Sequence, residues 1–131
     1  MIVNDGLVLL EDVQLAFMAT LEFGLFTTDV TITDATVAAD VTATEAAWAG
    51  YARTTATSWP TPTITGSTAS SQNGALLNFG NTSGSNQTFF GWFAIDPASG
   101  DLVAADNTGA IIIPSSGVYS FASVLTDTDA G

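Results

Sequence analysis

The sequence of 131 residues has no cysteine, no histidine and no lysine, and its only basic residue is Arg53. A serine or threonine nucleophile has no histidine or lysine to take its proton. Zinc sites made of histidine and cysteine, disulfides and thiolate chemistry are excluded as well. No glycine-rich loop ends in the Gly-Lys-Ser or Gly-Lys-Thr of a phosphate site. We therefore expect a protein that is not an enzyme and uses no cofactor.

Carboxylates are the reactive groups that remain. A glycoside hydrolase needs two of them across a cleft, one with a raised pKa, and no pair among the 13 acidic residues is singled out by its position. Calcium takes only oxygen ligands, which cluster at residues 96–101 and 127–129. Neither segment matches an EF-hand loop. Turn formation accounts for the first and solvation for the second, so we predict no metal site.

Positive charge is also scarce. Thirteen acidic residues face one basic residue, which gives a formal net charge of -12 at pH 7. Binding to nucleic acids and to anionic membranes depends on lysine and arginine, so we expect neither as a partner. A basic protein surface is the natural complement of this chain, although acidity alone also favours solubility.

Long hydrophobic runs are missing too, although 47% of the residues are hydrophobic. No stretch approaches the roughly 18 uninterrupted apolar residues of a membrane-spanning helix. A chain of this length can bury a core without a disulfide or metal. Part of the apolar surplus is therefore expected to contact a partner.

Short apolar segments separated by turns predict an all-β fold, a single-domain β-sandwich or jelly-roll-like barrel of residues 21–131. Residues 1–20 differ, because Leu10, Val13 and Phe17 recur at helical spacing. That spacing predicts a short N-terminal helix, with an extended arm as the alternative.

Residues 21–26 alternate in a way that predicts a half-buried strand. Residues 29–47 lack large core side chains and are expected to be mostly a surface loop, with room for a strand at 30–33. Further segments are expected as strands at 50–57, 75–79 and 118–124, a loop or edge strand at 64–73, and a polar tail at 126–131.

The clearest local signal is a hairpin in the second half of the chain. Residues 88–95 are strongly apolar and aromatic, which favours a strand. Residues 96–101 follow with proline early and glycine late, as in a loop built around a type I turn. We predict that residues 102–105 form the returning strand.

Arg53 and the three tryptophans are the candidate functional side chains. Near Tyr51, Arg53 is expected to pair with a carboxylate or stack on an aromatic ring in a structural role. Trp92 lies in the densest apolar run and is expected in the core. Trp48 and Trp59 lie near loops, so one of them is a candidate interface anchor.

Three segments resemble small structural proteins of tailed bacteriophages. Residues 25–28 read Leu-Phe-Thr-Thr, residues 39–53 run from Ala-Asp-Val to Gly-Tyr-Ala-Arg, and residues 91–105 run from Gly-Trp-Phe to Leu-Val-Ala-Ala. The resemblance covers roughly residues 1–105. It implies a virion protein, a group that includes capsid decoration, cement, tail and fibre components.

Within that group we expect a decoration or cement protein, made in the cytoplasm of the host bacterium and placed on the outer capsid surface. The resemblance implies a trimer that binds the major capsid protein. The alternative is a tail, adaptor or fibre component involved in host attachment, and a carbohydrate-active enzyme is a remote third option. The candidate interface residues are Leu7, Leu10, Val13, Phe17, Trp48 and Trp59, and the expected structural residues are Tyr51, Arg53 and Trp92.

Overall fold

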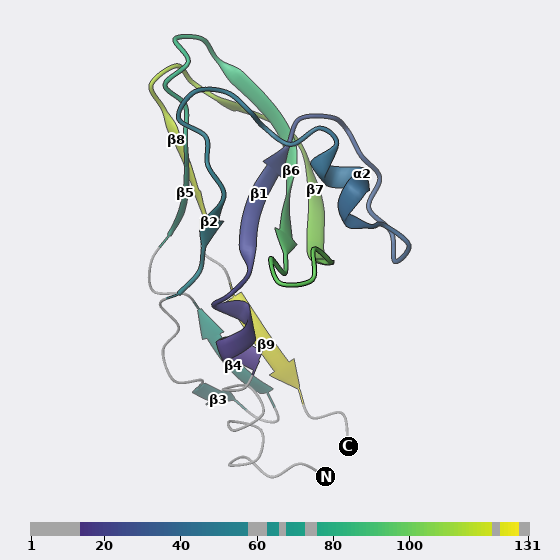
Figure 1. The fold of residues 1–131 in the computed structure, drawn as a ribbon. Helices are drawn as coiled ribbons and strands as arrows, with labels where there is room; N and C mark the ends of the chain where they lie inside the picture. The colour runs from purple at the N-terminus through teal and green to yellow at the C-terminus, as the bar shows by residue number, and fades with distance from the viewer. Residues whose placement is uncertain (1–13, 58–62, 66–67, 73–75, 122–123, 129–131) are drawn as a thin grey trace. The chain divides into compact units, whose positions relative to one another are not determined.

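The computed structural model describes residues 14–57, 63–65, 68–72, 76–121 and 124–128. Within them the fold is all-β, as the sequence predicts, with nine strands and short helical segments. The described residues form two compact units (Figure 1). One unit comprises Leu21–Thr55 and Asn78–Ser120, and the other comprises the described parts of Met1–Thr20, Ala56–Leu77 and Phe121–Gly131. The division expected from the sequence, an arm of residues 1–20 and a domain of residues 21–131, stays a prediction.

The first unit is built on a four-stranded antiparallel sheet in the order β2-β1-β6-β7. The sheet is open, because β2 and β7 lie at its two edges. A second, two-stranded sheet pairs β5 with β8. The strands are β1 (Glu22–Phe26), β2 (Thr54–Thr55), β5 (Leu77–Gly80), β6 (Gln87–Ile95), β7 (Leu102–Ile113) and β8 (Val118–Phe121).

β1 is buried on both faces rather than half buried as predicted. Phe23, Leu25 and Phe26 are all almost completely buried. Phe26 joins a core cluster with Phe93 on the neighbouring strand β6. The reason is that β1 lies between two strands and the chain that follows it folds back over one face of the sheet.

Residues 29–47 are mostly loop, as predicted, but several of their side chains pack on the sheet. They contain a helix, α2 (Ala38–Thr42), in which the Asp40 carboxylate accepts a hydrogen bond from the Val37 N–H at 2.9 Å. Val41 on α2 is fully buried against Phe26. Val30 packs on the same cluster, and residues 30–33 are not a strand. A five-residue helix is too short to leave a clear periodic pattern.

The predicted hairpin is confirmed, and α2 lies on the opposite side of it from β5 and β8 (Figure 1). β6 and β7 pair in the register that places Phe93 opposite Ala105. β7 continues to Ile113, so the apolar stretch at residues 111–113 belongs to the same strand. The pairing shifts between Phe89 and Gly91, an irregularity that the sequence alone does not predict.

Other strand boundaries also differ from the predictions. Only Thr54–Thr55 of the strand expected at residues 50–57 pairs in the sheet. Residues 118–121 of the strand expected at 118–124 form β8, residues 122–123 lie outside the described residues, and Val124 begins β9. The strand at residues 54–55 is shorter than expected because only these two residues pair with β1.

The second unit holds a three-stranded antiparallel sheet in the order β3-β4-β9. Its strands are β3 (Thr63–Thr65), β4 (Thr68–Gln72) and β9 (Val124–Thr128). Of residues 64–73, expected as a loop or an edge strand, residues 64–65 do lie on the edge strand β3, whereas residues 68–72 form β4, which is paired on both sides. Residues 126–128, expected in a polar tail, belong to β9. Polar threonine and serine strands lack the apolar alternation on which strand prediction relies.

Candidate functional site

The chain's only arginine, Arg53, lies near β1, on the side of that strand that faces β2. β2 pairs with Glu22 and Phe23 alone, which leaves the second half of β1 without a partner strand on that side. The Leu25 N–H donates instead to the Tyr51 hydroxyl at 3.1 Å, and the Leu25 carbonyl accepts from the Ala46 N–H at 2.9 Å. Tyr51 therefore replaces a strand as a hydrogen-bond partner of β1.

Arg53 forms a cluster with two carboxylates and two aromatic rings, which we call the Arg53 cluster (Glu22, Glu45, Tyr51, Arg53 and Phe93). Its Nε and Nη2 donate to the two Glu45 carboxylate oxygens, each at 2.8 Å. Nη1 lies 3.5 Å from Glu22 Oε1, and the guanidinium lies 5.4 Å from the centre of the Phe93 ring. The Tyr51 hydroxyl donates to Glu45 Oε2 at 2.8 Å. Both kinds of contact expected for Arg53 are thus present.

Glu45, Tyr51 and Arg53 each keep one protonation state near neutral pH. Burial raises the pKa of Glu45, but hydrogen bonds from Arg53 and Tyr51 together with the Arg53 charge hold that pKa below its ordinary value. Burial, and then the hydrogen bond to Glu45, raises the pKa of Tyr51. The hydrogen bond to Glu45 raises the pKa of Arg53 in spite of its burial. None of these three groups is poised to exchange a proton at neutral pH.

Gly24 makes the close packing of this cluster possible. A Cβ added at Gly24 would lie 2.7 Å from the Tyr51 hydroxyl oxygen and would overlap the Phe93 ring. Gly24 sits opposite Phe93 in the sheet, so the missing side chain leaves the space that the ring fills. The cluster is therefore tightly packed where it meets β1.

Trp48 connects the same loop to β5. Its indole N–H donates to the Gly80 carbonyl at 2.9 Å, and its ring meets Tyr51 edge-on with centroids 5.7 Å apart. Tyr51 in turn stacks on Phe79 at 6.1 Å. Trp48 is half buried, so part of its ring remains exposed to a partner.

The remaining residues singled out from the sequence fall in different places. Trp92, expected in the core, is only half buried, and its ring lies 6.1 Å from that of Phe23. Phe17 lies in the helical segment 14–18, which confirms the described part of the predicted N-terminal helix, and its side chain is 45% exposed. The candidates that lie outside the described residues are Leu7, Leu10, Val13 and Trp59.

The hairpin loop uses its oxygens internally. Asp96 Oδ1 accepts from the Ala98 N–H and Oδ2 from the Ser99 hydroxyl, each at 3.1 Å. Gly100 closes the loop with a φ of 78°. Among the described residues no group of three or more acidic side chains is placed to hold a metal ion. Turn formation therefore explains these polar residues, as the sequence suggested.

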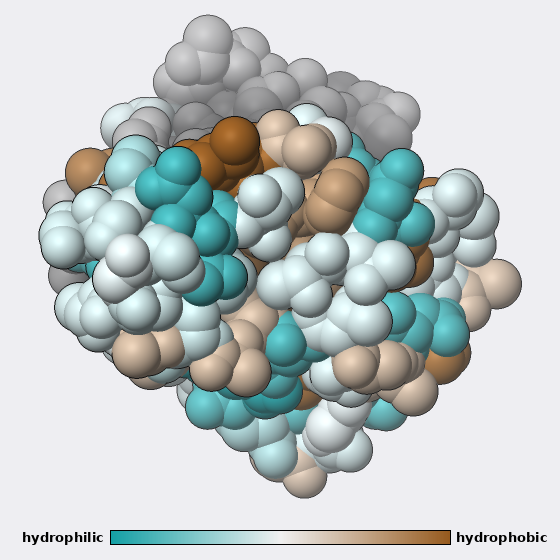
Figure 2. Space-filling model, turned by 90° about the horizontal axis from the view of Figure 1, so that it is seen from above, coloured by the Kyte–Doolittle hydropathy of each residue, from teal (hydrophilic) through white to brown (hydrophobic). Residues whose placement is uncertain are grey.

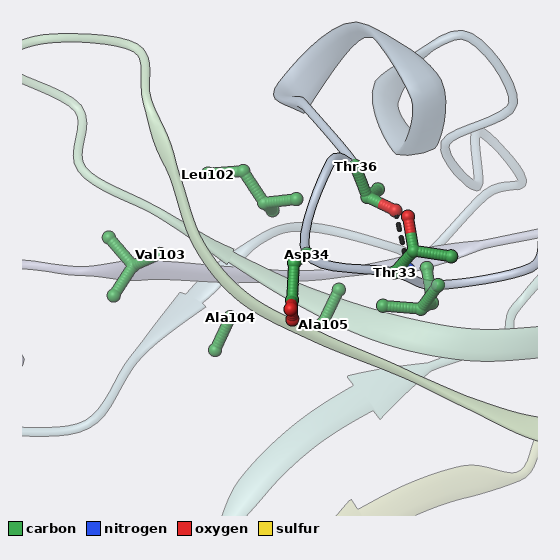
Figure 3. A pocket seen from close by; sticks show the side chains of 8 residues that line it. Thr33, Asp34, Thr36, Leu102, Val103, Ala104 and Ala105 are labelled. Atoms are coloured by element: carbon green, nitrogen blue, oxygen red, sulfur yellow. Dashed lines mark hydrogen bonds between the residues drawn. The ribbon is translucent and has the colours of Figure 1, made fainter.

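A shallow groove lies between the start of β7 and the loop that precedes α2 (Figure 3). Its volume is about 430 Å³. Thr33 and Thr36 tighten the loop wall, because the Thr33 N–H donates to Thr36 Oγ1 at 2.8 Å. We call it the β7-edge groove, and its lining residues are Ile32, Thr33, Asp34, Thr36, Leu102, Val103, Ala104 and Ala105.

The groove combines apolar side chains with polar groups of the threonine-rich loop, and it carries one carboxylate. Val103 is 43% exposed, and Asp34 is the charged residue of the lining. A second hollow adjoins it at Thr36 and Leu102 and adds Val37, which is 56% exposed, and Asp101. The view in Figure 2 shows mostly polar residues with hydrophobic ones in small patches.

Sequence reasoning missed this groove, because its two walls lie about 70 positions apart in the chain and share no local pattern.

No protein-family model, curated protein or solved structure matches this chain. In the part of the chain that the structure describes, no helix is long and apolar enough to cross a membrane. The assignment of function therefore depends on the residues themselves.

Proposed function

We propose that this chain is a non-enzymatic structural protein of a tailed-bacteriophage particle. Its role is that of a capsid decoration or cement protein, which binds the major capsid protein on the outer surface as a trimer. The resemblance of residues 25–28, 39–53 and 91–105 to small virion proteins supports this proposal.

The observation that carries the proposal is the internal neutralisation of the only basic side chain. Arg53 makes a two-point ion pair with Glu45 and a longer contact with Glu22. With a net charge of -12, the rest of the chain offers a partner carboxylates and apolar groups but no cation. Charge complementarity at interfaces favours a basic protein surface as the partner of such a chain.

The Gly-Tyr-Ala-Arg stretch at residues 50–53 fits a structural role as well. Tyr51 bonds the edge of β1, and Arg53 joins the two carboxylates beside it. Such a motif is expected in a family whose members share a fold but no common catalytic site.

The copy number in purified particles tests the proposal. Quantitative mass spectrometry relative to the most abundant virion protein is expected to give a ratio of the order of one to one, as a lattice protein requires. A handful of copies would move the chain to the tail or neck, where a role in host attachment becomes the assignment. Its absence from particles would refute the virion proposal.

An add-back experiment tests the capsid role directly. Purified chain mixed with particles that lack it is expected to bind to saturation and raise the temperature at which the capsid opens, because a ligand that binds only the intact lattice stabilises it. Light scattering of the free chain measures whether it is a trimer. Saturable binding without any change in the opening temperature would contradict the cement role.

A further inference from the structure

The β7-edge groove is bounded on one side by an unpaired sheet edge. In the order β2-β1-β6-β7, one long side of β7 has no partner strand among the described residues. Alternate N–H and C=O groups of an edge strand point away from its sheet. Leu102–Ala105 contains neither proline nor lysine, the residues that commonly protect such an edge.

The groove has defined ends. At one end Asn107 Nδ2 donates to Asp29 Oδ1 at 2.7 Å and to the Val30 carbonyl at 2.8 Å, which ties the loop to β7. At the other end the hairpin turn ends at Asp101, directly before β7. Five strand residues, 102–106, lie between these ends, a length of about 16 Å at about 3.3 Å per residue.

We propose that the β7-edge groove binds an extended segment of a partner protein in which lysine or arginine alternates with small apolar residues. The segment adds a strand beside Leu102–Ala105, and its backbone pairs with the open edge. Its apolar side chains cover Val103 and Ile32. This is the strand-addition mode of peptide recognition, in which backbone hydrogen bonds supply affinity and side-chain pockets supply selectivity.

Charge selects the occupant. Asp34 lines the groove, and Asp101 lines the adjoining hollow. The only basic residue of the chain, Arg53, is paired with Glu45 elsewhere. A second copy of this chain would bring its own net charge of -12 against these carboxylates, whereas a basic segment would neutralise them.

The inference rests on the proposed function only in that the chain acts by binding another protein. It names the surface and the chemistry of that partner, and both are tested with a defined probe. The probe is a fluorescein-labelled peptide of about seven residues in which valine alternates with lysine, long enough to span the groove. Fluorescence anisotropy with the full chain measures its affinity.

The variant Val103→Lys places a positive charge in the groove, and Val118→Lys is its matched control. Both valines are exposed strand residues, and Val118 lies on β8. We expect Val103→Lys to weaken peptide binding about tenfold or more, since it removes apolar contact and repels lysine. Val118→Lys is expected to change the affinity less than about twofold. Asp34→Asn provides a second, milder variant, with a loss of several-fold from one missing charge.

A peptide of the same sequence, N-methylated at alternate residues, tests the strand pairing. It keeps the side chains and charges but loses backbone donors, so we expect binding to fall at least tenfold. Equal binding of the methylated peptide, equal effects of the two lysine variants, or no binding of the unmodified peptide would each overturn the inference.

Particle binding separates this inference from the proposed function. If the chain is abundant on capsids and Val103→Lys decorates them as well as the unchanged chain does, the groove assignment fails and the virion role stands. If the chain is absent from particles while Val103→Lys still abolishes peptide binding, the virion role fails and the groove assignment stands.

Discussion

Tyr51 and Arg53 perform different tasks from positions two residues apart. Tyr51 satisfies a backbone N–H of β1 that no strand reaches, and Arg53 holds together the carboxylates of Glu22 and Glu45. Glu45 accepts hydrogen bonds from both Tyr51 and Arg53, so side chains close the loop of residues 45–53. At the scale of single residues, the unit depends on this small polar network beside an apolar core.

Replacing Tyr51 by phenylalanine tests the backbone role. The ring remains to stack on Phe79, but the Leu25 N–H loses its acceptor and Glu45 loses a donor. An unsatisfied buried donor costs about 1–3 kcal/mol, so we expect the free energy of unfolding to fall by that amount. Urea denaturation followed by tryptophan fluorescence measures it. An unchanged unfolding midpoint would mean that water takes over the hydroxyl's role.

The Glu45–Arg53 pair predicts a pH dependence. Because the pKa of Glu45 is lower in the folded state than its ordinary value of 4.5, the pair contributes stability above that value. The contribution is lost as the pH falls through the folded-state pKa. We expect Glu45→Gln to be less stable than the unchanged chain at pH 7, and the difference to shrink as the pH approaches 3.

Glu22→Gln is the control for that comparison. Glu22 lies farther from Arg53, at 3.5 Å, and its side chain is 37% exposed. Exposed pairs contribute little, so the control is expected to change the unfolding free energy by less than about 1 kcal/mol at either pH. A gap between Glu45→Gln and the unchanged chain that stays constant with pH would contradict the ionic origin of the effect.

At the scale of elements, α2 is the least obvious part of the first unit. It has only five residues, and a helix of that length is held by tertiary contacts rather than by its own hydrogen bonds. Its contact with the sheet passes through Val41, which belongs to the buried cluster with Phe26 and Phe93, and through the partly buried Ala38. Val41 is the only fully buried side chain of α2.

Val41→Ala is expected to destabilise the chain by about 2 kcal/mol, from lost apolar burial and the cavity that remains. Val37→Ala at the start of the same helix is the control, because Val37 is 56% exposed. Surface substitutions of this kind usually stay within about 0.5 kcal/mol. Thermal unfolding by circular dichroism compares the two variants, and equal losses would show that α2 does not anchor the core.

Elements with a local signature were predictable from the sequence, and others were not. The β6–β7 hairpin carries its aromatic strand and its Asp96–Asp101 turn within consecutive residues, so its position was correct. α2 and β4 lack such a signature. Their alanine, threonine and serine residues are compatible with loop, strand or helix until a partner decides between them.

The Arg53 cluster was predictable in part for a similar reason. A lone arginine among 13 acidic residues must meet a carboxylate, and the sequence indicated that much. Its partners Glu22 and Glu45 lie 31 and 8 positions away. The choice among the carboxylates depends on the register of β1 and the path of the loop, which no local pattern specifies.

For the whole molecule, self-repulsion is the dominant long-range effect. A net charge of -12 with one internal cation opposes the compact state, and salt screens such repulsion over a Debye length of about 8–10 Å near physiological ionic strength. We expect the unfolding temperature to rise as sodium chloride increases from about 0.02 M to about 0.5 M. A fall over that range would mean that the Arg53 pairs outweigh the general repulsion.

A variant with fewer carboxylates tests the origin of that salt dependence. Asp34, Asp101 and Asp106 are exposed, so replacing all three by asparagine is expected to leave the fold intact and flatten the response to salt. An unchanged slope would assign the salt effect to something other than net charge.

The sequence by itself determined the all-β class, the central hairpin, the acidic charge and the lack of groups for common catalysis. Each of these follows from composition or from patterns within about ten residues, where strand preference and turn chemistry operate. Tertiary structure alone decided that Arg53 meets Glu45, that residues 30–41 pack on the sheet, and that β7 borders an open groove. Those outcomes depend on strand order and register, which bring distant residues together only when the chain has folded.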